Sequence, residues 1–194
     1  MKGFTSRRTL LIVTSAIFFL CAVFCSESNA ANPCDASVIP KEVQSKLAKD
    51  YPDWQVETLE NLDGEDRKLW TNAHPNDCPG IAIGHFESKI ELSYALLLVS
   101  KSERKRQGFR VVAFTRSGPP AQYVSRLVMK WNDGLYYYNS DEVIATVPPG
   151  HYTEAIGSRN VQTDLDAILC ETLEKGAAVY YFRNRAYHEL ITSE

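Results

Sequence analysis

The feature that most constrains this chain is the segment over residues 80–99, GIAIGHFESKIELSYALLLV. It contains a short apolar run, a polar stretch and a longer apolar run, which predicts two strands joined by a turn. The second run, residues 92–99, is almost continuously apolar, as in a strand that is buried on both faces. This hairpin is therefore predicted to form the structural centre of a mainly β domain.

Residues 1–30 have the pattern of a signal peptide. Their first eight residues include three basic ones, an uncharged apolar run follows over residues 9–24, and small residues stand near the end at Ser28 and Ala30. Small residues at these two positions predict cleavage after Ala30. The apolar run is shorter than the roughly 18 residues of a spanning helix. We therefore expect export with cleavage, and an uncleaved anchor is the alternative.

A single mainly β domain is expected over residues 31–194. The signal contains three of the 21 basic and one of the 24 acidic residues, so the remaining chain has 18 basic and 23 acidic residues and a net charge of −5. An acidic surface argues against nucleic-acid binding, which requires a basic face. The expected localisation is periplasmic or secreted, with no nucleic acid as partner and no stable membrane span after cleavage.

Three of the five cysteines remain after cleavage: Cys34, Cys78 and Cys170. Exported proteins tend to keep their cysteines paired or buried. Cys34 and Cys78 lie in proline-flanked loops, where two side chains are free to meet, so we favour a Cys34–Cys78 disulfide. A Cys78–Cys170 disulfide is the alternative, although the apolar neighbours of Cys170 are typical of a buried free thiol. No cysteine has the spacing or context of a catalytic thiol.

The chain predicts an α+β fold of mainly antiparallel strands, with an N-terminal amphipathic helix packed on the sheet. This helix is expected over residues 40–51, where Val43 and Leu47 repeat at a spacing of four. A second, short helix is expected over residues 63–70, with Asp63 as its N-cap. Further strands are expected over residues 54–59, 109–115, 122–131, 135–139 and 143–147.

The strand expected over residues 122–131 has one apolar and one charged face. Alternation places Leu127, Met129 and Trp131 on the apolar face, and it places Arg126 and Lys130 on the charged face. This pattern is typical of a strand that is half buried.

A basic run between the strands at 92–99 and 109–115 is a candidate patch for an anionic partner such as lipid headgroups or polysaccharide. A solvated hairpin tip is the simpler interpretation, because the surrounding surface is acidic and such charges prevent wrong strand pairing. The residues of this patch are Lys101, Arg104, Lys105 and Arg106.

The segment over residues 161–175 fits two structures. Its apolar residues at helical spacing, followed by Lys175-Gly176, fit an amphipathic helix with a glycine C-cap. The sequence after it predicts a strand, a tight turn over residues 183–185 and a last strand. The whole segment resembles the terminal hairpins of uncharacterised secreted bacterial proteins, and this resemblance favours a strand over residues 167–173.

The central hairpin contains a segment that resembles one FG-GAP-type calcium loop. Residues 84–95 read Gly-His-Phe-Glu-Ser-Lys-Ile-Glu-Leu-Ser-Tyr-Ala. The family pattern is Gly-Asp-Phe-Asn-Gly-Asp-Gly-x-x-Asp-x-Ala, with the same length and the same Gly, Phe and Ala. In such loops, acids at alternating positions direct oxygens at one Ca²⁺. The resemblance places the ligand positions on His85, Glu87, Lys89 and Ser93.

This FG-GAP-like loop is predicted to be degenerate, with no metal and no other cofactor. Lys89 has no lone pair to donate and repels a divalent ion. Ile90 replaces the turn glycine, and a β-branched residue does not adopt positive φ without strain. One hypothesis is that Lys89 replaces the cation and bridges Glu87 and Glu91. An ordinary solvated turn is the alternative, since exposed ion pairs contribute little.

No catalytic constellation is recognisable. The four histidines, His74, His85, His151 and His188, lack the His-x-x-x-His spacing that places two ligands on one helical face. The sequence also has no Gly-x-Ser-x-Gly elbow and no glycine-rich phosphate loop. These observations make a catalytic role the less favoured interpretation.

The expected function is therefore that of an exported, non-catalytic binding or interaction protein, with an unknown protein or glycan of the cell envelope as partner. The alternative is a periplasmic or secreted hydrolase or metal-dependent enzyme. Its site would be assembled from dispersed residues such as His74, His85 and Glu87. Metal analysis of the purified protein separates the two, because stoichiometric zinc that is lost on His85→Ala would favour the enzyme.

Overall fold

The computed structural model describes residues 32–101, 108–119, 122–131 and 141–193. The chain divides into two units, residues 1–31 and residues 32–194, and all described residues belong to the second. The strand predicted over residues 135–139 lies outside the described residues. The same holds for three residues of the predicted anion patch, namely Arg104, Lys105 and Arg106.

The described elements are mostly strands, with two helices and one short 3-10 turn near the N-terminal side. In chain order they are η1 (Ala36–Val38), α1 (Lys41–Asp50), β1 (Trp54–Val56), α2 (Gly64–Ala73), β2 (Ile81–Gly84), β3 (Ser93–Ser100), β4 (Phe109–Ser117), β5 (Gln122–Trp131), β6 (Glu142–Val147), β7 (His151–Thr153), β8 (Asn160–Gln162), β9 (Ala167–Thr172), β10 (Gly176–Arg183) and β11 (Ala186–Ser193). The predicted mainly antiparallel β fold is confirmed.

The first sheet is centred on β3. One edge of β3 pairs with β4, and β4 pairs in turn with β5. The other edge is shared by two short strands, because β1 pairs with residues 98–100 and β2 with residues 93–96. The predicted hairpin over residues 80–99 is thus formed by β2 and β3, and its second strand has neighbours on both sides.

β1 and β2 meet at Leu97. The amide of Glu57 donates to the carbonyl of Leu97, and the amide of Leu97 donates to the carbonyl of Gly80, each over 2.9 Å. A Cβ atom at Gly80 would lie 2.2 Å from the carbonyl oxygen of Glu57. Both strands can therefore share one edge of β3 only because residue 80 has no side chain.

The second sheet has the order β11-β10-β9-β6 and is also antiparallel. A tight turn joins β10 to β11, and its Asn184 and Arg185 have φ angles of 53° and 66°. Positive φ at two successive positions matches the right-handed twist of a hairpin. The strand, turn and strand predicted at the C-terminal end are confirmed. The chain segment that connects β6 to β9 contains a separate hairpin, in which β7 pairs with β8.

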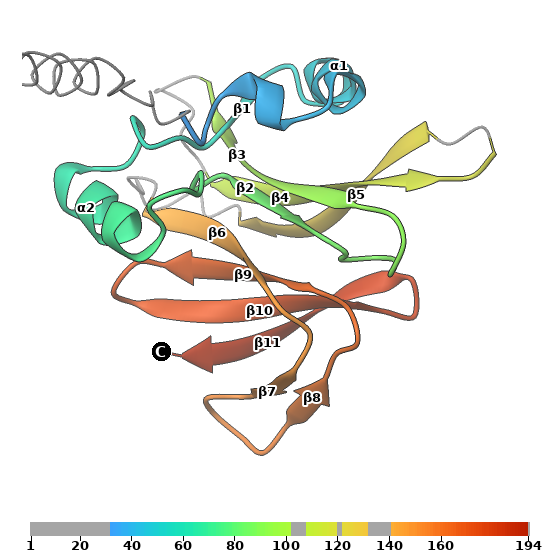
Figure 1. Ribbon diagram of the computed structural model, residues 1–194. Helices are drawn as coiled ribbons and strands as arrows, with labels where there is room; N and C mark the ends of the chain where they lie inside the picture. Colours follow the sequence, from blue (N-terminus) through green and yellow to red (C-terminus); the bar gives the residue numbers. More distant parts are fainter. Residues whose placement is uncertain (1–31, 102–107, 120–121, 132–140, 194) are drawn as a thin grey trace, which may run out of the picture. The chain divides into compact units, whose positions relative to one another are not determined.

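The two sheets pack face to face (Figure 1). The core between them contains Ala95, Leu97 and Val111 from the first sheet and Ile144 and Ile168 from the second. These side chains are at most 1% exposed. On the outer face of the second sheet, the β7–β8 hairpin contributes Val161 and Tyr152 to a smaller apolar cluster.

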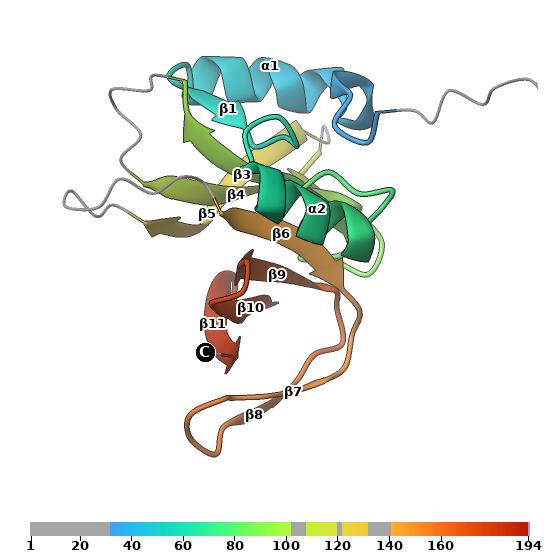
Figure 2. The same ribbon diagram turned by 90° about the vertical axis from the view of Figure 1, so that its left-hand side faces the viewer.

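The helices pack on outer faces of the sheets (Figures 1 and 2). In α1, the fully buried Val43 lies in a cluster with Leu96 and Phe114 of the first sheet. In α2, Trp70 packs against Val143 of β6. Asp63 caps α2, as predicted, by accepting hydrogen bonds from two amides of the first turn. Within the described residues, neither helix has the length and apolar character needed to cross a membrane.

The helical interpretation of residues 161–175 is wrong. Residues 160–162 form β8 and residues 167–172 form β9. Ala167, Ile168 and Cys170 are all buried, because β9 packs on both of its faces. A strand of this kind has no apolar–polar alternation, so its residues matched helical spacing by coincidence.

A β-bulge corrects the predicted faces of β5. Met129 pairs with Val111 and Leu127 with Val112, which leaves Val128 as an extra residue. The bulge moves Leu127 to the face opposite Met129, where it is 47% exposed. For the same reason Arg126, predicted to lie opposite Met129, shares the inner face with it and reaches the space between the sheets.

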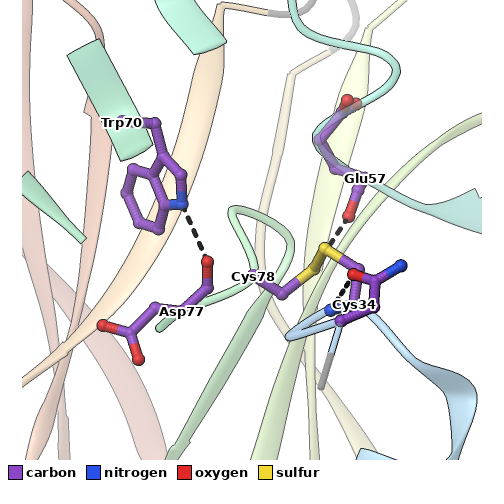
Figure 3. The surroundings of a disulfide bond; sticks show 6 residues. Cys34, Glu57, Trp70, Asp77 and Cys78 are labelled. Atoms are coloured by element: carbon purple, nitrogen blue, oxygen red, sulfur yellow. Dashed lines mark hydrogen bonds between the residues drawn. A yellow bond between two sulfur atoms is a disulfide. The ribbon is translucent and has the colours of Figure 1, made fainter. Parts of the chain in front are cut away.

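The predicted Cys34–Cys78 pairing is confirmed, with the two sulfur atoms 2.07 Å apart (Figure 3). Cys170 is a buried free cysteine, so the alternative Cys78–Cys170 pairing is wrong. β9 holds Cys170 in the core between the sheets, whereas Cys34 and Cys78 lie on the outer side of the first sheet. Close to the disulfide, the Trp70 indole donates to the carbonyl of Asp77, which attaches α2 to the loop before β2.

Candidate functional site

A cavity of about 420 Å³ opens between the two sheets, next to the start of β4, β6 and β10 and the end of β5. Its volume lies within the roughly 300–1,000 Å³ typical of small-molecule sites. We call it the sandwich cavity. It is lined by Phe109, Met129, Trp131, Glu142, Cys170, Thr172, Lys175, Gly176, Ala177, Ala178, Tyr180, Glu189 and Ile191.

The first sheet supplies an apolar wall. Phe109 of β4 pairs directly with Trp131 of β5, and Val111 pairs with Met129. Because of the bulge in β5, Met129 and Trp131 face the second sheet together with Phe109. Trp131 remains 45% exposed and Ile191 42% exposed, so these two side chains lie where the cavity meets solvent.

The second sheet supplies the polar groups, and the most buried carboxyl among them is Glu142, the first residue of β6. Its exposed fraction is 8%, and its Oε1 accepts a hydrogen bond of 2.8 Å from the Thr172 hydroxyl. Burial raises the pKa of Glu142 to about 7. The Thr172 hydrogen bond opposes this rise, nearby Asp141 adds to it, and Lys175 again opposes it. Glu142 therefore changes its charge near neutral pH.

Glu189 of β11 is the second carboxyl of the cavity. It lies opposite Tyr180 in the β10–β11 pairing, and the Tyr180 hydroxyl donates to its Oε1. Burial raises the pKa of Tyr180, and the hydrogen bond to Glu189 adds to the rise. Tyr180 therefore stays protonated, and its hydroxyl donates a hydrogen bond to Glu189.

Cys170 lies in the same wall as a buried thiol. Burial is the main cause that raises the pKa of Cys170, and the negative charges of Glu142 and Glu189 add to it. A nucleophilic cysteine requires the opposite shift, because the thiolate is the reactive form. Cys170 therefore contributes an apolar wall atom and no nucleophile.

Lys175 and Asp141 form an ion pair beside the cavity. Lys175 belongs to the β9–β10 turn and its side chain is 60% exposed, while the Asp141 side chain is 10% exposed. Lys175 binds Oδ2 of Asp141. The other oxygen, Oδ1, is buried without a hydrogen-bond partner in the described part of the chain. Oδ1 of Asp141 can therefore still accept a hydrogen bond.

The ligand positions of the predicted degenerate loop point in different directions. The amide of His85 donates to Oδ2 of Asp166 over 2.7 Å, and its ring Nδ1 lies 3.3 Å from the carbonyl of Glu91. Ser93 is fully buried and accepts a hydrogen bond from Thr115. Lys89 is exposed. Among the described residues, no group of three or more His, Cys, Asp or Glu side chains is placed to hold a metal ion.

Glu87 pairs with Arg126. Arg126 Nε lies 3.3 Å from Oε1 of Glu87, whose side chain is 9% exposed, and the Tyr187 hydroxyl donates to the same oxygen over 3.2 Å. The hypothesis that Lys89 bridges Glu87 and Glu91 is thus replaced by a cation from β5. The bulge in β5 is the reason, because it turns Arg126 inward, and the sequence pattern did not reveal it.

A second cavity, also about 420 Å³, lies beside this loop and near the end of β10. It brings together Glu87 and Lys89 with two carboxylates of the β8–β9 connection, Asp164 and Asp166. Asp166 already accepts the His85 amide, and Glu87 is paired with Arg126. Two of its three described carboxylates, Glu87 and Asp166, therefore serve contacts that hold the loop in place.

The residues of the alternative enzyme site serve separate local roles. His74 ends α2, stacks on Trp70 with 4.2 Å between ring centroids, and lies 3.5 Å from a carboxylate oxygen of Asp77. His85 and Glu87 belong to the β2–β3 loop. Within the described chain, no hydrogen bond or ion pair joins His74 to that loop.

Lys101 is the only residue of the predicted anion patch that falls among the described residues. Its Nζ donates to the carbonyl of Pro52 over 2.7 Å, and its amide donates to the carbonyl of Asp53. It also lines a third, smaller cavity of about 310 Å³ between α1 and β1. Lys101 therefore supports the turn before β1.

Sequence reasoning did not identify Glu142, Tyr180 and Glu189 as site residues. The one available signal was the charged Asp141-Glu142 pair at the start of β6, directly before its apolar residues. Comparison with known proteins adds no further guidance: no family model, no curated protein and no solved structure matches the chain.

Proposed function

We propose that residues 31–194 form an exported, non-catalytic binding protein that holds a small, mainly apolar molecule in the sandwich cavity. The observation that carries this proposal is the cavity itself, which combines an apolar wall with a few convergent polar groups. This combination is the usual composition of a ligand site. The cavity favours a small molecule over the envelope protein or glycan that the sequence suggested.

Two observations support export. Residues 1–30 have the signal-peptide pattern described above. The Cys34–Cys78 disulfide is typical of proteins in oxidising compartments such as the periplasm or the extracellular space. Expression of the full chain, followed by N-terminal sequencing of the exported product, tests this part, and a start at Ala31 is the expected result.

Binding is tested by titration with the neutral fluorescent probe N-phenyl-1-naphthylamine. Saturable binding of one probe per chain is expected for the wild type. Ala178→Trp fills the cavity and should weaken binding at least tenfold, and Ile191→Trp provides a second filling variant at the rim. Ala186→Trp is the matched control, because Ala186 is exposed at the start of β11. Equal binding by all variants would refute the proposed site.

A secreted hydrolase is the second candidate, because a carboxyl with a pKa near 7 suits general acid–base catalysis. An enzyme would turn over a bound ester or amide, and Glu142→Gln would abolish turnover while binding persists. The metal-dependent version with His74, His85 and Glu87 predicts stoichiometric zinc in the purified protein. The turnover assay and the zinc analysis therefore distinguish an enzyme from a non-catalytic binding protein.

A further inference from the structure

The polar groups of the sandwich cavity differ in what they can still offer to a ligand. Each hydroxyl has a single proton to donate. Thr172 gives its proton to Oε1 of Glu142 over 2.8 Å, and Tyr180 gives its proton to Oε1 of Glu189. Both hydroxyl donors in the wall are therefore already in use.

The acceptors are only partly used. An ionised carboxylate has about four acceptor positions on its two oxygens. Among the described residues, nothing donates to Oε2 of Glu142 or to Oε2 of Glu189. Glu142 is only 8% exposed, so its carboxylate pays a desolvation cost that the single Thr172 hydrogen bond offsets in part. A ligand that supplies hydrogen-bond donors would remove this cost.

The charges around the cavity also favour a cationic ligand, because the carboxyls outnumber the cations among the described residues. Lys175 is the one cationic side chain among the described lining residues, and it is bound to Asp141. Asp141, Glu142 and Glu189 together carry three carboxyls against this single ammonium. Glu142 is largely buried, so its negative charge attracts a cation more strongly than a solvated carboxylate does, whereas the exposed Glu189 adds a weaker attraction.

We propose that the ligand is an amphipathic amine, with an apolar body against Phe109, Met129 and Trp131 and an ammonium head at Glu142, while Glu189 adds a further negative charge in the cavity wall. This inference rests on the proposed function, since it specifies the ligand of the same cavity. An ammonium provides three donors and a positive charge, and it needs no acceptor in return. It therefore fits a wall whose two hydroxyls already donate and whose two carboxylates keep free acceptor positions.

The test uses three probes with one apolar body and different heads: octylammonium, 1-octanol and octanoate. Calorimetric titration is done at pH 8, where Glu142 is mostly ionised. Octylammonium is expected to bind at least tenfold more tightly than 1-octanol, and octanoate most weakly. Glu142→Gln and Glu189→Gln should each reduce octylammonium affinity at least fivefold and leave 1-octanol affinity within twofold. The matched control is Glu91→Gln, which removes an exposed carboxyl outside the cavity and should change neither.

The outcomes separate this inference from the proposed function. If 1-octanol or octanoate binds as tightly as octylammonium, the amine proposal is wrong and the cavity remains a binding site. If no probe binds, and the naphthylamine probe does not bind either, the proposed function itself fails. If Glu142→Gln does not fold, Glu189→Gln decides the question, because Glu189 is exposed and its replacement places little demand on folding. An unchanged head preference in that variant would overturn the proposal.

Discussion

Glu87 and Glu142 are two largely buried carboxyls of the same sandwich, near opposite ends of β10, and their surroundings differ. Glu87 receives a guanidinium from β5 and a hydroxyl from β11. Glu142 receives one hydroxyl, and its pKa is raised to about 7. A buried carboxylate in direct contact with a cation holds a structure together, whereas a buried carboxyl that contacts only a hydroxyl is available to a ligand or a proton. The difference separates a structural carboxyl from a candidate functional one.

The largest effect is expected where neither carboxyl is touched. Replacement of Cys34 and Cys78 by serine removes a crosslink across a sequence separation of 44 residues. The chain-entropy model then predicts a loss of about 4 kcal/mol in the free energy of unfolding. Urea unfolding measures the loss. Octylammonium should still bind more tightly than 1-octanol to this variant, since the disulfide lies on the other side of the first sheet. Loss of this preference would show that binding in the cavity depends on the overall stability of the fold.

Glu142→Gln should stabilise the protein at high pH. The folded-state pKa of Glu142 lies above the usual 4.5, so the folded state binds more protons than the unfolded state between pH 4.5 and 7. The contribution of Glu142 to stability is complete below pH 4.5 and decreases as the pH rises through 7, by up to about 3 kcal/mol. The variant has no such loss.

Urea unfolding at pH 5 and pH 8 tests this pH dependence. The variant should gain over the wild type at pH 8 and differ little at pH 5. Glu87→Gln should show no gain at either pH, because Arg126 already balances that charge. A gain from Glu87→Gln equal to that from Glu142→Gln would remove the distinction between the two carboxyls.

Arg126→Leu should destabilise the protein by about 2 kcal/mol. Removal of one partner from a buried pair costs roughly 3–5 kcal/mol, and the cost here is smaller because the Arg126 side chain is 39% exposed. Thermal unfolding measures the loss. The double variant Arg126→Leu/Glu87→Leu should recover part of it, since no unpaired carboxylate remains. Additive losses in the double variant would contradict the pairing.

The smallest effect is expected at the loop that resembles a calcium site. Lys89→Ala should change the free energy of unfolding by less than about 0.5 kcal/mol, as is usual for exposed surface residues. Millimolar Ca²⁺ should leave the melting temperature of the wild type unchanged, because the ligand positions diverge in the structure. A Ca²⁺-dependent rise in melting temperature would show that Glu87 belongs to a ligand site, which contradicts its assignment as the structural carboxyl of the two.

Sequence patterns predicted features that depend on neighbouring residues. Asp63 as an N-cap, the β2–β3 hairpin and the turn at Asn184 each require only a few adjacent positions. The bulge at Val128 was not predictable, because it depends on how β5 aligns with β4. That single extra residue exchanged the faces of Arg126 and Leu127 and so determined the partner of Glu87.

The sandwich cavity could not be predicted for a related reason. Its walls come from six strands between Phe109 and Ile191. Residues 170–180 supply seven of the thirteen described lining residues, but the apolar wall and both glutamates come from other parts of the chain. Glu142 stands at the start of an apolar strand, where a carboxyl is usually exposed. Only the packing of two sheets shows that it faces inward. The hairpin at residues 80–99, by contrast, is encoded by neighbouring residues.

The burial of Cys170 has a consequence for oxidative folding. Three thiols can form three different disulfides, and two of these would join Cys170 to Cys34 or Cys78 and leave the native partner unpaired. Thiol–disulfide exchange proceeds through the thiolate, and burial raises the pKa of Cys170. Once β9 is placed between β6 and β10, this sulfur is withdrawn from exchange, and the remaining two have only each other. By burying Cys170, the second sheet thus favours the correct Cys34–Cys78 pairing, although neither of these cysteines belongs to it.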